Sequence, residues 1–284
     1  MNAVNRAATS IFDLFLPLLD RIGFPCGLVV VSAVFGVLAL VAFKYLSAQR
    51  KIKATKARIT GHLIEIRIYQ DDLAIVGKAI GKVLLRNLQY LSLNLAPFAI
   101  LALPFAVVLA QLVVRYGYEP VRVRAADEKV LPGRGAMLEV ELARAHADDV
   151  RNLRVELPEG IRPISPLLRV PAEGRAYQEV VAVAPVRGDV GFVLADGSRA
   201  TKSIAAGSPA RTMQPERGRG FFSALLWPAE STLPADSPFE RVRLELPERP
   251  MGWFPDGPAG VLVVFLVVSM VAGLLVLKPL RIQI

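Results

Sequence analysis

The chain has 284 residues, of which 53% are apolar, with a formal net charge of +9, two histidines and one cysteine. The apolar residues are concentrated in three nearly uncharged stretches of about 20 residues each, which excludes a single soluble domain and a disordered chain. A lone cysteine excludes an internal disulfide framework, and one cysteine with two histidines is too few for a structural zinc site.

Residues 1–25 are expected to form an amphipathic helix in the outer membrane interface. The segment Ser10–Ile22 is apolar, but Asp13, Asp20 and Arg21 interrupt it, so it is too short and too charged to cross a bilayer. An interfacial helix accommodates both features, because its apolar face enters the lipid while its charges stay hydrated. A disordered N-terminal tail is the alternative interpretation.

The three apolar stretches predict three transmembrane helices, over residues 26–46, 93–115 and 257–277. A helix needs about 20 apolar residues to cross the ~30 Å of hydrocarbon in a bilayer. Any one such stretch could be a buried core helix, but three in a chain of this length favour a membrane protein. A cleaved signal peptide is the alternative for the first stretch. Its apolar run exceeds the roughly 7–15 residues typical of signal peptides, and it lacks a small-residue cleavage site, so we expect an uncleaved anchor.

The distribution of charge predicts how the chain crosses the membrane. Residues 44–90 hold ten lysines and arginines against three acidic residues, whereas residues 115–256 hold twenty of each. Basic segments next to spans stay on the cytoplasmic side. We therefore expect residues 47–92 and the tail 278–284 in the cytoplasm and residues 116–256 outside, with the N-terminus also outside.

Residues 47–92 are expected to form a basic helical hairpin, with helices over about 46–69 and 72–90. Apolar residues recur there at every seventh position, as in the seam of a helical pair. These seam residues are Ile52, Ile59, Ile66, Leu73 and Ile80, and Val76 and Val83 supply a second row in the later part. His62 is expected to be a polar seam residue. The break between the helices is expected at Gln70–Asp72, where an aspartate can accept the free backbone N–H groups that open the second helix.

The basic residues of the hairpin serve first as an orientation signal, and attraction to anionic lipid or ribosomal RNA would be an additional use. The side chains best placed for such contacts follow the first span directly. They are Arg50, Lys51, Lys53, Lys56 and Arg58. Specific DNA binding is not expected.

Residues 116–256 are expected to form an antiparallel β-sandwich of immunoglobulin-like size. Apolar and polar residues alternate in short stretches separated by turn residues, as in half-buried strands. Examples of these stretches are Leu138–Leu142, Leu153–Leu157 and Val242–Leu246. The apolar island Phe221–Trp227 is expected to rest on the outer leaflet or on the sandwich, with Trp227 and Trp253 at interface depth.

The sequence carries no recognisable catalytic, phosphate-binding or metal-binding motif, so we expect no enzyme activity, no cofactor and no metal. Polar residues of the spans are more informative, because they are costly in hydrocarbon and tend to face protein or water. They are Ser32, Lys44, Asn94, Gln111 and Ser269. Hydrogen bonding between helices is the simpler explanation for Ser32 and Ser269. For Asn94, Gln111 and Lys44 a hydrated groove is an equally good one.

The predicted order is an interfacial helix, a span, a basic cytoplasmic hairpin and a proline-containing second span. This order resembles the core of the YidC-like membrane-protein insertase superfamily and its small three-span relatives. Local similarity lies in FDLFLPLLDRIG before the first span, KYLSAQRKIKATKARI after it and IYQDDL in the hairpin. The likeness covers roughly residues 10–114 and the third span. Two features depart from the family: residues 27–43 lack the arginine of the bacterial type, and the β domain is inserted between the second and third spans.

The resemblance implies a groove that is open to the cytoplasm and to lipid. Such a groove receives the polar flank of a client segment and lowers the cost of moving it into the bilayer without ATP. Lys44, Asn94, Gln111, Ser32 and Ser269 would line it, and the hairpin would guide clients or contact the ribosome. The alternative function is a membrane-anchored scaffold, in which the sandwich recognises an envelope protein and the hairpin binds a cytoplasmic one.

Overall fold

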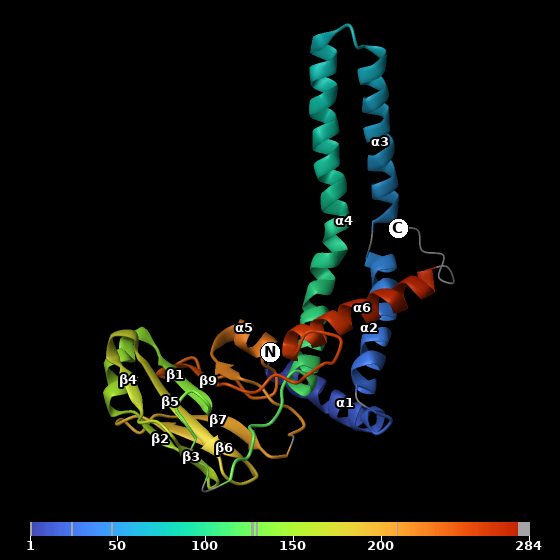
Figure 1. Cartoon of the computed structure of the whole chain (residues 1–284). Coiled ribbons are helices and arrows are strands. Elements are labelled where there is room, and N and C mark those ends of the chain that lie inside the picture. Colours follow the sequence, from blue (N-terminus) through green and yellow to red (C-terminus); the bar gives the residue numbers. More distant parts are fainter. Residues whose placement is uncertain are drawn as a thin grey trace. The chain divides into compact units, whose positions relative to one another are not determined.

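A computed structural model describes residues 2–23, 25–46, 48–125, 128, 130–208 and 210–277 (Figure 1). The chain divides into two compact units. Unit 1 comprises Met1–Val31 and Ala106–Val267, and unit 2 comprises Ser32–Phe105 and Val268–Ile284. The tail 278–284, which the charge pattern assigns to the cytoplasm, lies outside the described residues.

Three helices in the described part of the chain are long and apolar enough to cross a membrane. They are α2 (Cys26–Leu46), α4 (Leu73–Tyr116) and α6 (Gly257–Leu277). Each contains one of the predicted spans, and a separate β region lies between α4 and α6 in the sequence. The chain is thus a membrane protein with a helical part and a β region.

The second span and the second helix of the hairpin are one continuous helix, α4, of 44 residues. This corrects the sequence analysis, which separated them into helices over 72–90 and 93–115. Glycine and proline are absent between Gly81 and Pro97, so the backbone hydrogen bonding continues through the expected boundary. Pro97 and Pro104 lie inside the helix. Both fall in the apolar stretch, where neighbouring helices can satisfy the backbone groups that a proline leaves without a hydrogen bond.

The predicted hairpin is formed by α3 (Gln49–Ile68) and the first part of α4, residues 73–92, which we call the arm. Figure 1 shows α3 and α4 side by side, and an ion pair of 3.6 Å joins Lys82 of α4 to Glu65 of α3. Asp72 opens α4 at the predicted break, because its Oδ1 accepts the backbone N–H groups of Ala74 and Ile75 at 2.9 and 3.2 Å.

The seam of the arm follows the predicted heptad only on α3. There the half-buried residues are Ile52, Ile59, His62 and Ile66. On α4, Leu73 and Ile80 are 85% and 47% exposed, so their assignment to the seam is wrong. The least exposed row of α4 in the arm is the second one that the sequence predicts, with Val76 and Val83, and Ala79 lies between them. The non-helical turn after Tyr69 interrupts the heptad of α3, so the first row does not continue into α4.

Within unit 2, α2 and α6 approach each other through small residues. A Cβ added at Gly36 would lie 2.1 Å from the carbonyl oxygen of Ser269, and one added at Gly273 would lie 3.5 Å from the carbonyl oxygen of Gly36. Ser32 and Gly36, like Ser269 and Gly273, are four residues apart. This spacing places small residues on one helix face and allows close backbone packing between membrane helices, which accounts for the two serines.

The β region belongs to unit 1 and contains two antiparallel sheets (Figure 1). The larger sheet has the order β3-β5-β1-β9-β8, with β4 also paired to β5, and the smaller has the order β2-β6-β7. The bounds are β1 (Ala136–Leu142), β2 (Arg154–Glu156), β3 (Ile161–Pro163), β4 (Leu168–Val170), β5 (Arg175–Ala182), β6 (Val186–Val193), β7 (Arg199–Ala206), β8 (Glu216–Gly218) and β9 (Phe239–Leu244).

One apolar core is shared by the two sheets. The alternation predicted for β1 and β9 is confirmed, since Val140 and Val242 are buried while Glu139 and Arg243 point away on the solvent side of the same strands. The smaller sheet contributes the fully buried Phe192. Short 3-10 helices, η1 (Arg144–Asn152) and η2 (Pro171–Glu173), complete the region.

The N-terminal helix α1 (Asn2–Asp20) and the short α5 (Gly220–Leu226) also belong to unit 1. α1 is helical from its start, so the helix extends beyond the segment Ser10–Ile22 on which the prediction rested. The apolar island forms α5, and Trp227, which follows it, packs against the β core beside Tyr118, with ring centroids 6.4 Å apart. Trp253 is fully exposed.

Candidate functional site

Most of the exposed basic residues of the arm lie on α3. The five basic residues singled out from the sequence are all exposed. They are Arg50, Lys51, Lys53, Lys56 and Arg58. Among the residues that the structure describes, these five form no ion pair with an acidic side chain. Their positive charge therefore remains available to an anionic ligand or surface.

The acidic residue of α3, Glu65, is occupied within the arm. His62 Nδ1 lies 2.9 Å from its Oε2, and Lys82 Nζ lies 3.6 Å from its Oε1. The hydrogen bond from His62 holds the pKa of Glu65 below its ordinary value, and the charges of Lys82 and His62 act in the same direction. His62 is thus a polar seam residue, as predicted.

An exposed apolar stripe runs along α4, and we call it the leucine face. It consists of Leu84, Leu88, Leu91 and Leu95. These side chains are 61%, 66%, 53% and 53% exposed, respectively. Their spacing of four, three and four residues puts them on one side of the helix, away from the half-buried Val83 and Tyr90.

The leucine face has no acidic neighbour on its own helix, because the sequence of α4 from Leu73 to Tyr116 contains no acidic residue. The exposed Lys78 and Lys82 lie on other sides of α4, since they precede Leu84 by six and two residues, and Lys82 pairs with Glu65. An exposed apolar stripe of this length marks a surface that lipid or another protein covers.

The predicted groove residues of unit 2 take different places. Ser32 is fully buried, and Ser269 lies at the close contact between α2 and α6. Lys44 is exposed in the last turn of α2. Asn94 is half-buried on α4, next to the leucine face, and its Nδ2 donates to the carbonyl oxygen of Tyr90 at 2.7 Å. Its carboxamide oxygen has no such bond to the described residues, so it can still accept one.

Gln111 belongs to unit 1 and does not join Asn94, which corrects their grouping. It lies 17 residues further along α4, a separation of about 25 Å in an α-helix. Gln111 is fully buried, and its Nε2 donates to Thr9 Oγ1 of α1 at 3.0 Å. Its amide therefore serves an internal contact between α1 and α4.

That contact is a polar cluster, formed by Thr9, Asp13, Gln111 and Arg115, that the sequence analysis did not find. Arg115 Nη2 lies 2.6 Å from Asp13 Oδ1, and the Arg115 side chain is 6% exposed. Arg115 Nη1 donates to the Gln111 carbonyl at 3.1 Å and to its side-chain oxygen. The guanidinium also lies over the Phe12 ring, 5.4 Å from its centroid. Charges this close to a span are costly unless paired, so the cluster attaches α1 to α4.

A second contact joins the same helices, two turns further along α1 at Asp20. Tyr116 Oη donates to the Asp20 carboxylate at 2.9 Å, and the same carboxylate accepts the backbone N–H of Gly27 at 3.2 Å. A Cβ at Gly27 would collide with the side chains of Tyr116, Asp20 and Leu16, so glycine lets this contact form as it is. A signal for the first contact existed in the sequence, because Thr9 and Asp13, and likewise Gln111 and Arg115, are four residues apart.

The helix α1 is amphipathic, but its polar side faces the protein and its apolar side is exposed. Its polar residues at positions 5, 9 and 13 face protein, and Asn5 Nδ2 donates to the carbonyl of Ala224 in α5. Its large apolar residues are exposed on the opposite side; they are Val4, Ile11, Leu14, Phe15 and Leu18. The helix does have an apolar face, as predicted, and the charges Asp13 and Asp20 bind protein groups while part of each side chain stays exposed.

The β region contains a buried ion pair and no grouping that resembles a catalytic site among the described residues. Lys202 of β7 is fully buried and pairs with Glu230, whose carboxylate also accepts Ser203 Oγ at 2.7 Å. Burial lowers the pKa of Lys202, although Glu230 opposes the shift. His146 contacts Asp149 at 3.0 Å on the surface. No group of three or more His, Cys, Asp or Glu side chains in the described chain is arranged to hold a metal ion.

Comparison with protein-family models, with curated proteins and with solved structures found no match to this chain.

Proposed function

We propose that the protein assists the insertion or assembly of membrane-protein clients in a bacterial inner membrane, as an insertase-like protein and not as an enzyme. The observation that supports this most directly is the leucine face, an exposed apolar stripe that runs from the arm into the second span on a helix without acidic residues. A client helix would lie along this face while its polar flank contacts Asn94 and Lys44. The positive-inside distribution of charge supports a cytoplasmic arm and an outer β region.

The energetics of the leucine face fit a transient contact. Burying a fully exposed leucine contributes about 1.5–3 kcal/mol, and these four are only partly exposed. Covering all four would then contribute on the order of 4–6 kcal/mol, before the entropic cost of association. A client would be retained long enough to be guided and then released into lipid, where its apolar surface is equally well solvated.

The basic residues of the arm would act before this contact. Arg50, Lys51, Lys53, Lys56 and Arg58 would attract anionic lipid or the ribosome and so concentrate clients near the span. We also propose that the two sheets of the β region form an immunoglobulin-like sandwich, supported by their shared core and antiparallel pairing.

The proposal is tested by client insertion into vesicles that contain the reconstituted full chain. The double variant Leu88→Gln/Leu91→Gln should reduce the initial rate of insertion roughly thirty-fold, since the loss of about 1 kcal/mol at each of the two positions weakens client binding by about that factor. Leu168→Gln is the matched control, because Leu168 is 61% exposed in the β region. It should leave the rate unchanged.

The arm is tested in the same assay with Lys51→Glu/Lys53→Glu/Lys56→Glu, which should slow insertion without altering stability, because the three side chains are exposed. If both multiple variants insert clients at the wild-type rate, the proposal fails. The membrane-anchored scaffold would then replace it, with the β region binding an envelope protein.

A further inference from the structure

A cavity of about 180 Å³ opens at one end of the β region. Its floor is apolar and buried, with Val121, Val180 and Leu246 at 6%, 0% and 8% exposure. Three arginines stand around it: Arg122, Arg124 and Arg134. The acidic residue of the lining is Glu245, and Glu128 pairs with Arg124 from outside the lining, so three arginines stand with two acidic residues around the opening.

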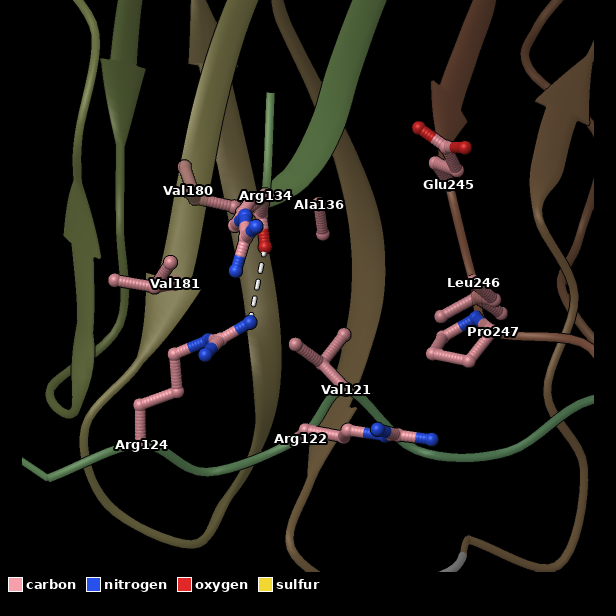
Figure 2. Close-up of a pocket in the computed structure, with 11 residues that line it drawn as sticks. Val121, Arg122, Arg124, Arg134, Ala136, Val180, Val181, Glu245, Leu246 and Pro247 are labelled. Carbon is pink, nitrogen blue, oxygen red and sulfur yellow. Dashed lines mark hydrogen bonds between the residues drawn. The ribbon is translucent and has the colours of Figure 1, made fainter. Parts of the chain in front are cut away.

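Figure 2 shows how these side chains lie. The guanidinium groups of Arg124 and Arg134 point toward one another, and Arg122 extends below Leu246 and Pro247. Glu245 lies on the other side of the opening from Arg124. The dashed line in Figure 2 is the hydrogen bond from Arg124 to the backbone carbonyl of Arg134.

The backbone that carries the arginines is fixed on every side. Val121 N–H donates to the Ala205 carbonyl at 2.9 Å, and Arg124 N–H donates to the Ala182 carbonyl at 2.9 Å. The turn that carries Arg134 is held by the buried Glu179, whose carboxylate accepts the N–H groups of both Gly133 and Gly135. The main chain that carries the three arginines is therefore anchored to the β region.

The three arginines differ in whether their guanidinium groups already have hydrogen-bond or ion-pair partners. Arg124 Nη1 lies 2.7 Å from Glu128 Oε1, and its Nη2 donates to the Arg134 carbonyl at 3.3 Å, so this side chain is held in place. Arg122 and Arg134 are exposed. Within the described residues, neither of their guanidinium groups has an ion pair or a hydrogen bond. Both retain their full set of donors for a ligand.

We propose that this cavity binds a phosphate group. The planar guanidinium group matches the oxygen geometry of phosphate and can donate two parallel hydrogen bonds to it. A volume of about 180 Å³ equals roughly six water molecules at ~30 Å³ each, which suits one phosphate with a small substituent and is too small for a nucleotide cofactor. This site is independent of client insertion.

The position of the cavity allows two sources of phosphate. Arg122 follows the end of α4 at Tyr116 by six residues, and Pro247 precedes the start of α6 at Gly257 by ten. These two connections pair with each other, since Glu119 N–H donates to the Pro247 carbonyl at 2.8 Å. The cavity is therefore close, along the chain, to the ends of two spans, and both a lipid headgroup and a soluble phosphate could reach it.

The experiment uses the full chain in maltoside detergent, which contains no phosphate, and titrates inorganic phosphate at constant ionic strength. Binding is measured from the broadening of the ³¹P resonance. The variant Arg122→Gln/Arg134→Gln should weaken binding roughly ten-fold or more, because each charge-assisted hydrogen bond contributes about 1.5–3 kcal/mol.

Arg151→Gln/Arg154→Gln is the matched control, since it removes the same charge from a second arginine-lined hollow of the β region. It should bind phosphate as the wild-type protein does. Absence of phosphate binding by the wild-type protein overturns the proposal, and so does equal weakening in the two double variants.

Repeating the titration in phospholipid nanodiscs distinguishes the two sources. Competition by headgroup phosphate abolishes the ³¹P broadening seen in maltoside and assigns the site to lipid. Persistence of the broadening assigns it to a soluble phosphate compound. Circular dichroism of each variant checks that the β region remains folded.

Discussion

Charged residues have different roles in unit 1 and in the arm of unit 2. In unit 1, Arg115 and Lys202 are buried, and each pairs with a carboxylate from a distant part of the chain. In the arm, the basic residues of α3 are exposed, and the acidic partner there, Glu65, contacts His62 and Lys82 at the seam. Removing a charge should therefore destabilise unit 1, whereas in the arm it should change what the protein binds.

The apolar surfaces of the two units differ in a related way. The exposed apolar side of α1 is opposite to polar residues that already bind protein, so lipid is its natural environment. The leucine face lies on a helix without acidic residues. Under the proposed function, the exposed side of α1 contacts lipid and the leucine face contacts a client.

The largest effect is expected at the buried pair of the β region. Glu230→Ala leaves the fully buried Lys202 without its partner and should reduce the free energy of unfolding by about 3–4 kcal/mol. Denaturant unfolding of the full chain in detergent, followed by the fluorescence of Trp227, measures it. Glu240→Ala is the control, because Glu240 is 52% exposed and 3.6 Å from Arg219, and its loss should cost less than about 1 kcal/mol. An equal loss of unfolding free energy in both variants would contradict the expected difference between buried and exposed ion pairs.

A smaller loss is expected where α1 meets α4. Asp13→Asn keeps the shape of the side chain but removes the charge that compensates Arg115, so stability should fall by about 2 kcal/mol, less than at Lys202 because Asp13 is 28% exposed. Thermal unfolding in detergent measures this loss of stability. Arg6→Gln, at an exposed position of the same helix, should have no measurable effect. A stable Asp13→Asn protein would show that α1 does not depend on this pair.

The smallest effect concerns acid pH. Burial raises the pKa of Glu141, but hydrogen bonds from Arg241 and Arg175 outweigh burial, and the pKa lies below its ordinary value. A carboxylate with a lowered pKa stabilises the fold above its unfolded pKa, and this stability is lost as the pH falls through the folded one. Stability should therefore decrease below about pH 4.5.

Glu141→Gln tests this pH dependence. The variant should be less stable by about 1 kcal/mol at pH 7 and should lose less on acidification than the wild-type protein, as measured by denaturant unfolding at each pH. Glu65→Gln in the arm should change the acid dependence far less, because its contacts are exposed to solvent. A reversed order of the two variants would contradict the assignment of structural charge to unit 1.

Local sequence patterns were sufficient for the regular elements. Uncharged stretches identified α2 and α6, period-two alternation identified β1 and β9, and Gln70–Asp72 was recognised as the break before α4. Each pattern acts within a few residues through burial or hydrogen bonding, so it can be read without knowing the neighbours in space. The grouping of Gln111 with Asn94 failed because hydropathy carries no information on which partner a polar residue meets.

The contacts that define the candidate sites depended on residues far apart in the chain. Asp13 and Arg115 are separated by 102 positions, and Glu230 reaches Lys202 from a loop outside the strands. Composition specified that the chain enters a membrane, where its helices lie and which segment carries the excess positive charge. The fold specified that α4 is unbroken, that α1 turns its polar side inward and that three arginines surround one cavity, because long-range packing selects among local patterns that are individually compatible with several arrangements.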